Sequence, residues 1–329
     1  MSRSCRHFRQ LLLMLKQNTN ITNLPNLKDK CFGGAYSIHD PELTKARDTL
    51  ISSWSSVSVS HEKIKQDYFS EYKEWVNTSQ NLIGFDQFSN PCFTQGTTES
   101  FAQFYLRFKN RRLRLARGEY FYHQMMYKLR FTNQFAWLDD EPLKSGDVLL
   151  ISAPFSATGN IPDKLDEWLE QCNNLGIPVM LDLAYINLGI KFEIDLSHPC
   201  IEYVVTSLSK YFPLELHRIG IRWQRTKHED QIYVVNEYDY NYINILSVWL
   251  GLNMMQKFSP FWLQKKYHQY QIDWCNKLNL EPSKSIIFGI DKQSQYPDYN
   301  RGTKTNRLCF SRIWDGRMTY NENDIVKTN

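Results

Sequence analysis

Two short apolar runs in the middle of the chain carry polar residues at or just after their ends. The run PVMLDL (178–183) contains Asp182, and the run EYVVTS (202–207) is followed three residues later by Lys210. Both runs read as buried parallel strands. Because ligands bind outside the carboxyl ends of the strands in open α/β sheets, we expect the carboxylate and the amine to face one crevice.

Further polar groups flank these two residues and would enter the same crevice. They are a phenol, two hydroxyls and a guanidinium, contributed by Tyr185, Ser207, Ser209 and Arg218. The set suits a phosphorylated, aldehyde-bearing pyridine. The amine can form an imine, the carboxylate can pair with a protonated ring nitrogen, and the hydroxyls and guanidinium can hold a phosphate. The plainer interpretation of Lys210, a surface lysine after a strand, is disfavoured by these neighbours.

In order and spacing the residues form two patterns, D-x-A-Y beginning at Asp182 and S-x-S-K-x(7)-R-x-G beginning at Ser207. Here the sequence resembles the fold-type I pyridoxal-phosphate enzymes of the class I/II aminotransferase kind. The resemblance covers roughly residues 85 to 225, with thinner support to residue 312. It implies an α/β fold with a mostly parallel central sheet flanked by helices, followed by a smaller α+β C-terminal domain.

The resemblance also implies a division of the chain into three parts. We expect an N-terminal arm over residues 1–40, a large cofactor-binding domain over residues 41–235, and hinge helices with a small domain over residues 236–329. The arm begins with a short amphipathic helix, since its apolar run LLLML is too short for a secretory signal. Two further helices are expected, around Glu42 to Trp54 and around His61 to Trp75.

A glycine and two threonines follow the strand PCFT. Gly96 permits close approach of the backbone, and Thr97 and Thr98 can cap the helix that follows. Free N–H groups at such a helix start form a natural phosphate site. The alternative is a plain strand-to-helix turn; the presence of Lys210 favours phosphate binding.

The segment EYFYH would cover the ring of the cofactor. By the resemblance, Tyr120 stacks on the pyridine face and His123 supports Asp182; an aromatic core patch is the alternative interpretation. In the loop APFSATG, Ser156 stands where the family usually has an asparagine that hydrogen-bonds the pyridine 3-oxygen. That departure weakens the argument for simple transamination. The next helix is expected to start at Pro162 and Asp163 and to end at Gly176.

After a polar linker, TKHEDQ, two long helical runs lead into the C-terminal part. SIIFGI and NRLCFSRIW then read as strands of the smaller domain. By the resemblance, Arg307 matches the arginine that grips the substrate carboxylate through a bidentate bond, and Arg312 is a weaker candidate. An ordinary surface arginine on an edge strand is the alternative.

Composition narrows the classes of function. A chain of 329 residues with a net charge of +4 and 42% hydrophobic residues is an ordinary globular protein, for which neither nucleic acid nor a membrane is the expected partner. The seven cysteines are scattered without a C-x-x-C pair, which favours reduced thiols and a cytoplasmic location. No Cys/His cluster has the spacing of a metal site.

The resemblance implies the following roles. Lys210 holds pyridoxal phosphate as an imine and then serves as the base at the substrate's α-carbon, while Asp182 keeps the ring nitrogen protonated and Tyr185 bonds the ring 3-oxygen. The phosphate is held by Gly96, Thr97, Ser207, Ser209 and Arg218. We expect a homodimer with active sites at the subunit interface, where a tyrosine of the second subunit reaches the phosphate.

The reaction expected first is amino-group transfer from an amino acid to a 2-oxo acid. Elimination, replacement, ring closure or decarboxylation in specialised amino-acid biosynthesis is the alternative. A catalytically silent relative would have lost the lysine or the aspartate, and both are present. A nucleotide-binding protein using GTTES as its phosphate loop would need the spacing G-x-x-x-x-G-K-[ST], which the segment lacks.

Overall fold

The structure is a computed structural model of the chain, and it describes residues 27, 30–58, 60–130, 135–237 and 241–321. The short helix expected at the start of the N-terminal arm lies outside these described residues, as does Cys5.

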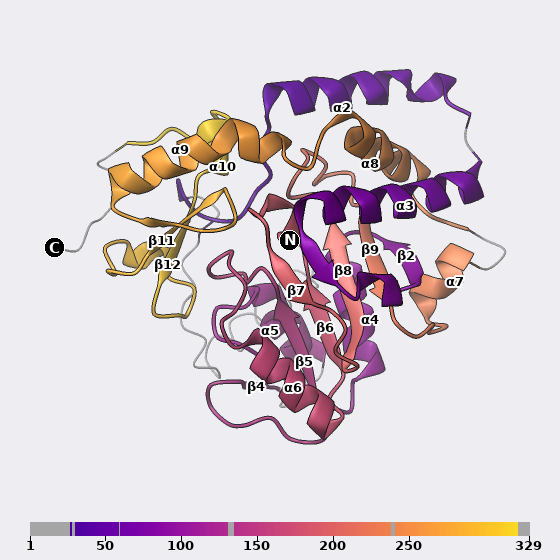
Figure 1. Cartoon of the computed structure of the whole chain (residues 1–329), viewed down its shortest axis with the longest axis vertical. Coiled ribbons are helices and arrows are strands. Elements are labelled where there is room, and N and C mark those ends of the chain that lie inside the picture. Colours follow the sequence, from indigo (N-terminus) through magenta and orange to yellow (C-terminus); the bar gives the residue numbers. More distant parts are fainter. Residues whose placement is uncertain (1–26, 28–29, 59, 131–134, 238–240, 322–329) are drawn as a thin grey trace, which may run out of the picture.

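A seven-stranded sheet forms the centre of the molecule (Figure 1). Its order is β2 (Asn90–Thr94), β9 (Gly220–Gln224), β8 (Ile201–Ser207), β6 (Val179–Asp182), β5 (Asp147–Ser152), β3 (Arg112–Leu115) and β4 (Phe135–Trp137). The strands from β8 to β4 are parallel to their neighbours, and β9 is antiparallel to both β2 and β8. The predicted mostly parallel sheet is therefore confirmed, including the strands at PVMLDL and EYVVTS.

Helices cover both faces of this sheet, and alternate residues of each strand serve alternate faces. The flanking helices are α3 (His61–Ser79) and α6 (Leu165–Leu175) on one face and α4 (Thr97–Arg107) and α5 (Phe121–Arg130) on the other. In β5, Leu149 and Ile151 belong to the core with α3 and α6, whereas Val148 and Leu150 belong to the core with α4 and α5. Burial on both faces explains why these strands are continuous apolar runs in the sequence.

Several helix ends follow from local sequence. Helix α2 (Pro41–Ser53) starts at Asp40, whose carboxylate accepts from the N–H groups of Glu42 and Leu43. Helix α6 ends at Gly176, which has φ +62°, as predicted. The same helix begins at Leu165 rather than at Pro162 and Asp163, because a turn precedes it.

The expected threonine caps are wrong. Helix α4 begins at Thr97 itself, its N-cap is Gly96, and no side chain caps it. Gly96 has φ +76° and ψ 172°, a conformation that only glycine adopts readily. The first N–H groups of α4 are thus not used by a threonine side chain at the N-cap.

The C-terminal part adds helices and a small antiparallel sheet. Its elements are α7 (Gln231–Glu237), α8 (Ile245–Lys257), α9 (Trp262–Leu278), β10 (Glu281–Pro282), β11 (Phe288–Asp291), β12 (Asn306–Cys309) and α10 (Ser311–Trp314). A two-stranded pair, β1 (Asn81–Ile83) with β7 (Glu193–Asp195), lies apart from both sheets. Figure 1 shows α9 and α10 beside β11 and β12, and α2, α3 and α8 on the other side of the molecule.

The strand expected over NRLCFSRIW is only half correct. Residues 306–309 form β12, but the chain then turns into α10, so Arg312 lies on a helix. Phe310, Ile313 and Trp314 pack into one apolar cluster with Phe32. Their spacing of three and four residues is helical, and it decides the local structure here.

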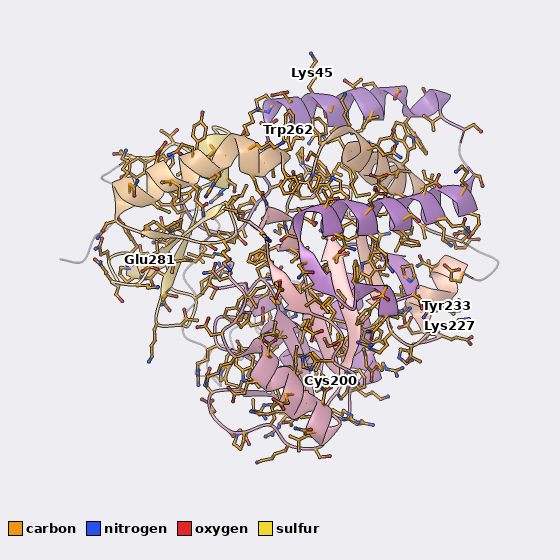
Figure 2. The ribbon with its side chains drawn as sticks, viewed as in Figure 1. Lys45, Cys200, Lys227, Tyr233, Trp262 and Glu281 are labelled. Carbon is orange, nitrogen blue, oxygen red and sulfur yellow. The ribbon has the colours of Figure 1, made fainter. Side chains whose placement is uncertain are left out.

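Side chains fill the space between the sheets and the helices. Figure 2 shows this packing, with the exposed Lys45 on α2 pointing away from it. No helix in the described part of the chain has both the length and the apolar character needed to cross a bilayer.

Candidate functional site

A cavity of about 320 Å³ lies at the carboxyl ends of the central strands β5, β6 and β8, beside the turn between β2 and α4. Its volume is within the range of roughly 300–1,000 Å³ that is usual for small-molecule sites. All of the predicted site residues except His123 and Arg307 line it, namely Gly96, Thr97, Thr98, Tyr120, Ser156, Asp182, Tyr185, Ser207, Ser209, Lys210 and Arg218. The structure thus brings residues from distant parts of the chain to one volume.

One end of the cavity is built for an anion. The start of α4 points its N–H groups there, and Arg218 lies across it, with its Nη2 donating to the carbonyl of Gln95 (2.9 Å) and to Oγ1 of Thr98 (3.2 Å). A Cβ added to Gly96 would lie 2.4 Å from that same Nη2. Glycine is therefore required where the guanidinium crosses the helix start. The start of α4 and the Arg218 guanidinium together form a positively charged site, which we call the anion seat.

Two serine hydroxyls complete this anion seat. Oγ of Ser207 donates to the carbonyl of Ile219 (2.9 Å) and accepts from the N–H of Ser209 (3.1 Å), and the two serine hydroxyls are 2.8 Å apart. A Cβ on Gly220 would lie 2.8 Å from the carbonyl carbon of Gly96, so the β2–α4 turn and β9 pack backbone to backbone. The seat is held in place entirely by contacts within the chain.

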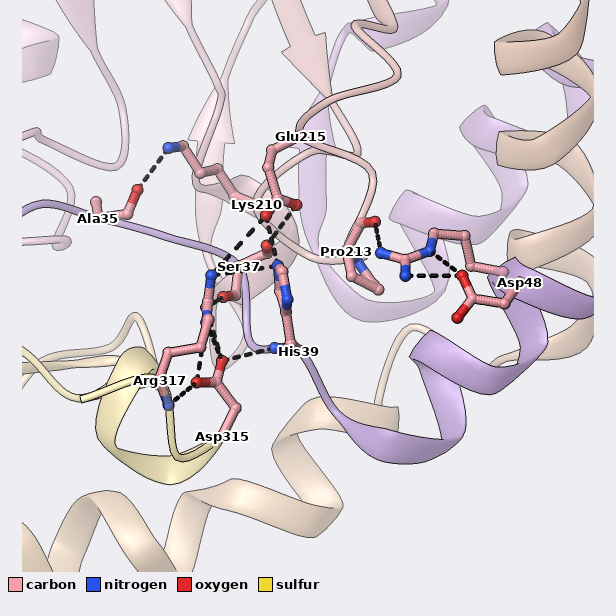
Figure 3. Close-up of polar contacts among 10 residues, drawn as sticks. Ala35, Ser37, His39, Asp48, Lys210, Pro213, Glu215, Asp315 and Arg317 are labelled. Atoms are coloured by element: carbon pink, nitrogen blue, oxygen red, sulfur yellow. Dashed lines mark hydrogen bonds and ion pairs between the residues drawn. The ribbon is translucent and has the colours of Figure 1, made fainter. Parts of the chain in front are cut away.

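The amine of Lys210 points toward the part of the cavity wall that contains Ala35. Its Nζ donates to the carbonyl of Ala35 (2.6 Å), as Figure 3 shows. The segment around Ala35 is fastened to the loop after the lysine, since Oγ of Ser37 donates to Glu215 (2.8 Å) and Nε2 of His39 lies 2.5 Å from the same carboxylate. The N-terminal segment is thus part of the site.

The C-terminal segment is attached to the same wall. The backbone N–H of His39 donates to Asp315 (2.8 Å), and Arg317 donates both to Asp315 (2.6 Å) and to the carbonyl of Ser37 (2.5 Å) (Figure 3). Three remote parts of the chain therefore meet beside Lys210. No pattern in the sequence indicates this meeting.

Two buried carboxyl groups lie at the base of the cavity. Burial, and next the nearby carboxyl of Glu119, raise the pKa of Asp182 to about 7, although Asp182 also accepts from the N–H of Ala184 (3.0 Å). Glu119 accepts from the N–H groups of Tyr120 and Ser152, each at 2.8 Å, and its own pKa is raised by burial. A protonated ring nitrogen beside Asp182 would supply the missing cation and favour its charged form. The donor set therefore fits a pyridine ring.

The groups expected around that ring are also in the cavity. Tyr120 is 40% exposed and stacks on Tyr122 with ring centroids 5.8 Å apart. Tyr185 packs edge-on against Phe288 at 5.4 Å. Oγ of Ser156 is buried and has no hydrogen-bond partner among the described residues, so it can accept or donate a bond to a ligand.

The two remaining predicted residues lie behind the cavity wall. Nδ1 of His123 bonds the hydroxyl of Tyr105 (2.6 Å), and Nε2 has no partner in the part of the chain that the structure describes, so the predicted bond to Asp182 is not formed. Burial lowers the pKa of His123 to about 3, which keeps the imidazole neutral.

Arg307 is almost completely buried in β12. Its guanidinium donates to the carbonyls of Gly34 (2.6 Å) and Ser156, and it lies 4.3 Å from the ring centroid of Phe288. It therefore stands just behind two residues that line the cavity, instead of projecting into it. Arg312, the weaker candidate, donates to the carbonyls of Lys30 and Gly33 and does not line the cavity.

The sequence analysis missed three charged residues of the site. Arg301 and Glu215 line the cavity, and Glu119 lies beneath it near Asp182. Glu119 could have been found from its position in the aromatic segment EYFYH, because a carboxyl group buried next to aromatic rings needs hydrogen-bond donors around it. No local sequence pattern identifies Arg301 as a site residue. In the described ranges no group of three or more His, Cys, Asp or Glu side chains is placed to hold a metal ion.

Comparison with known proteins agrees with this geometry. Residues 92–236 match the family described as aminotransferase class I and II. No curated protein sequence matches the chain.

Solved structures with the same fold cover most of the chain. The histidinol-phosphate aminotransferase from Clostridium acetobutylicum has a TM-score of 0.54 at 14% identity, covering 87% of this chain and 98% of its own. The PLP-bound C-S lyase from Staphylococcus hominis has a TM-score of 0.62 at 10% identity, covering 90% and 92%. The L-threonine-O-3-phosphate decarboxylase from Porphyromonas gingivalis has a TM-score of 0.57 at 12% identity, covering 85% and 95%.

At these identities the solved structures show the fold, and they carry different reactions on it. The matched segment contains Asp182, Lys210 and the whole anion seat. Pyridoxal phosphate, the cofactor expected from the sequence, is the cofactor that the family match and the fold indicate. The chain thus resembles the class I and II aminotransferase family over residues 92–236 and has the architecture of the fold-type I pyridoxal-phosphate enzymes.

Proposed function

We propose that this protein is a pyridoxal-phosphate enzyme that acts on an amino acid. The observation that carries the proposal is the convergence of Asp182 and Lys210 on one cavity that also contains a preformed anion seat. A carboxylate, an amine and a phosphate site in that arrangement match the three functional groups of one cofactor.

The residues that would hold the cofactor follow from their contacts. The N–H groups at the start of α4, the two serine hydroxyls and Arg218 bind the phosphate, as charge-assisted hydrogen bonds to backbone and guanidinium require. Asp182 would pair with the ring nitrogen, Tyr120 would cover the ring and Tyr185 would bond the ring hydroxyl. When bound, pyridoxal phosphate supplies an electron sink for bonds broken at the substrate's α-carbon.

Lys210 has two roles in this proposal. Its amine would hold the cofactor through the aldehyde, and in turnover it would take and return the proton at the α-carbon of the substrate. The bond from its Nζ to the carbonyl of Ala35 (2.6 Å) holds the amine on the cavity side. That bond must break before the amine can reach a carbon atom, so Ala35 acts as its resting partner.

Arg307 is our candidate for the substrate's α-carboxylate. The guanidinium donates to the carbonyls of Gly34 and Ser156, and both of those residues line the cavity. A guanidinium has five N–H donors, so donors remain for a carboxylate that enters between these two residues. A small shift of the Ser156 loop would open that approach.

The reaction proposed first is transfer of the amino group to a 2-oxo acid. A second candidate is a lyase-type reaction, meaning elimination, replacement, decarboxylation or ring closure. The observation that favours it is Ser156, whose hydroxyl reaches less far toward the ring oxygen than the asparagine usual in the family. A C-S lyase and a decarboxylase are also among the solved structures that share this fold.

We also propose that two copies of the chain assemble around the site. Leu216 is 88% exposed, two residues before Arg218 of the anion seat, and Tyr242 is 71% exposed. A large apolar side chain so close to a functional residue is typical of a surface that another subunit covers. Sedimentation equilibrium of wild type and of Leu216→Glu would test it: a monomeric wild type contradicts the proposal.

The cofactor is tested by absorbance. Purified protein reconstituted with pyridoxal phosphate should absorb at roughly 410–430 nm, as an imine of the bound cofactor does, and Lys210→Ala should lack that band. Lys191→Ala, which removes a lysine from a loop outside the cavity, is the matched control. A reconstituted wild type without the band would contradict the proposal.

The reaction is tested by its products. Holoprotein is mixed with candidate amino acids and a 2-oxo acid acceptor, and both keto-acid formation and substrate loss are followed. A new 2-oxo acid that requires the acceptor supports transamination. Substrate loss without any such product would reject it in favour of the lyase-type reaction.

A further inference from the structure

Arg301 is carried to the cavity by a turn that is held rigidly ahead of β12. The side chain of Asn300 donates to the carbonyl of Thr303 (2.8 Å) and bonds Asn306 (2.9 Å), and it accepts from the N–H of Gly302 (2.8 Å). Gly302 has φ +89°, which suits glycine alone among the residues of the turn. The position of the arginine is therefore fixed before any ligand arrives.

This turn packs against the part of the cavity wall that carries Tyr120 and Ser156, which we call the substrate side. A Cβ on Gly118 would lie 2.4 Å from Cγ2 of Thr303 and 2.8 Å from Cβ of Ala157, so the turn touches the segments that carry Tyr120 and Ser156. Tyr120 and Tyr185 are also among the electrostatic neighbours of Arg301. The arginine thus lies near Tyr120 and Tyr185, the two residues that would contact the cofactor ring.

Arg301 lacks a counter-ion. Among the residues that the structure describes it forms no ion pair and no hydrogen bond. Burial, and then the neighbouring guanidinium of Arg307, lower the pKa of Arg301 to about 9. The arginine is still charged at neutral pH and only partly exposed, so a charge without a partner is costly there.

The acids around Arg301 already have other partners. Glu119 interacts with Arg301 electrostatically, but its oxygens accept from Ser152 and from the N–H of Tyr120. Glu215, which lines the cavity together with Asp182, is paired with His39. Neither carboxylate forms an ion pair with the arginine within the described chain.

The other charged groups of the cavity already have ligands under the proposed function. Lys210 is assigned to the cofactor aldehyde, Asp182 to the ring nitrogen, Arg218 to the phosphate and Arg307 to the substrate's α-carboxylate. One guanidinium, that of Arg301, is left for the rest of the substrate.

We propose that Arg301 binds a second anionic group on the substrate, so that the enzyme acts on amino acids whose side chain ends in a carboxylate or a phosphate. This inference rests on the proposed function. It adds the substrate class, which the family match leaves open, and it makes Arg301 a residue that determines specificity. A carboxylate and a phosphate share the chemistry that a guanidinium recognises, two or more oxygens in one plane.

The test measures amino-acid binding to the reconstituted holoprotein through the change in the absorbance of the bound cofactor. The acidic probes are L-aspartate, L-glutamate and O-phospho-L-serine. The neutral probes of matched shape are L-asparagine, L-glutamine and L-serine. We expect at least one acidic probe to bind more tightly than its neutral counterpart by about tenfold or more, as for a buried charge pair.

The variant Arg301→Gln should remove that preference. Binding of the acidic probe should weaken by about tenfold or more, while binding of the neutral probe and of pyridoxal phosphate itself stays within about twofold. Lys304→Gln is the matched control, because Lys304 lies in the same turn, is exposed and does not line the cavity. The acidic probe that loses most identifies the anionic group, carboxylate or phosphate.

Two results would overturn the inference while leaving the proposed function intact. One is equal binding of acidic and neutral probes by the wild-type holoprotein. The other is equal weakening of both kinds of probe in Arg301→Gln, which would place the arginine on the α-carboxylate that all of them share. Failure of the wild type to take up the cofactor is a different result, and it would overturn the proposed function itself.

Discussion

The two ends of the cavity are built in opposite ways. At the anion seat each polar side chain already has partners within the chain: Arg218 bonds Gln95 and Thr98, and the hydroxyls of Ser207 and Ser209 bond each other. At the substrate side Oγ of Ser156 and the guanidinium of Arg301 have no partner among the described residues.

This difference separates what the fold holds permanently from what it leaves for a ligand. A preformed anion seat loses little conformational entropy when a phosphate arrives, which suits a cofactor that stays bound. Unpartnered polar groups cost stability until a ligand satisfies them, which suits recognition of the cofactor ring by Ser156 and of a substrate that must be told apart from similar molecules by Arg301. We therefore expect substitutions at the two ends to affect different quantities.

The largest effect is expected at Asp182, between the two ends. Asp182→Asn keeps the shape but removes the charge that pairs with the ring nitrogen. Loss of one partner of a buried ion pair costs about 3–5 kcal/mol, so kcat should fall by about 10²- to 10⁴-fold. Steady-state kinetics of the reconstituted variant checks this, with bound cofactor quantified in parallel. A variant within about tenfold of wild type would show that the carboxylate does not serve the ring.

The pH dependence of stability should reveal the same carboxyl group in the cofactor-free protein. Burial raises the pKa of Asp182 to about 7, above its unfolded value near 4. The folded state then binds more protons than the unfolded state, so stability is full below about pH 4 and is lost as the pH rises through about 7. At about 1.4 kcal/mol per pKa unit, the loss is about 4 kcal/mol. Glu119, whose pKa is also raised, adds in the same direction.

Urea unfolding of the cofactor-free protein between pH 5 and pH 8 measures the part of this loss that occurs above pH 5, about 3 kcal/mol. Asp182→Asn should flatten the dependence, because an amide does not titrate. Bound pyridoxal phosphate should flatten it too, since a protonated ring nitrogen favours the charged carboxylate. An unchanged slope in Asp182→Asn would show that another group is responsible.

The anion seat could be predicted from the sequence because its parts are close together along the chain. The segments 94–98 and 207–220 each lie within one turn or loop, and both follow strands that are recognisable as apolar runs. Once the strands are placed side by side, the residues at their ends meet without further information. The mostly parallel sheet was predictable for the same reason.

The substrate side could not be predicted in the same way. The turn at Arg301 and residues 34–36 line the cavity, and Ser37 and Asp315 hold that segment through contacts between parts of the chain that are far apart in sequence. Arg307 aligns with the family pattern, yet its direction depends on the carbonyls of Gly34 and Ser156. Likewise, His123 bonds Tyr105 because the packing of α4 on α5 brings them together. No local sequence pattern predicts contacts of this kind.

A smaller effect is expected from Gly96→Ala at the anion seat. The new Cβ would lie 2.4 Å from Nη2 of Arg218, and alanine is strained at φ +76°. The strain costs about 1–3 kcal/mol, so pyridoxal phosphate should bind about tenfold or more weakly. Gly146→Ala is the control, because Gly146 also has a positive φ, +93°, but nothing lies within 4 Å of its Cβ. Equal cofactor dissociation constants for the two variants would show that the seat does not bind the phosphate.

The smallest effect, and the one that tests the comparison most directly, is expected for Ser156→Ala. The buried hydroxyl of Ser156 has no partner in the described chain, so its removal should raise the stability of the cofactor-free protein by up to about 1 kcal/mol. The same change removes a hydrogen bond to the cofactor ring, so pyridoxal phosphate should bind about two- to fivefold more weakly. The stability of the cofactor-free protein should therefore rise while the affinity for the cofactor falls. This is the result expected for a polar group whose role is to bind a ligand.

Ser100→Ala is the control for these opposite changes in stability and cofactor affinity. Ser100 on α4 is also buried with an unpartnered hydroxyl, but it does not line the cavity. Its removal should stabilise the cofactor-free protein in urea unfolding without changing cofactor affinity. If Ser156→Ala behaves like Ser100→Ala, the hydroxyl of Ser156 is a packing defect, and the contrast between the two ends of the cavity then depends on Arg301 alone.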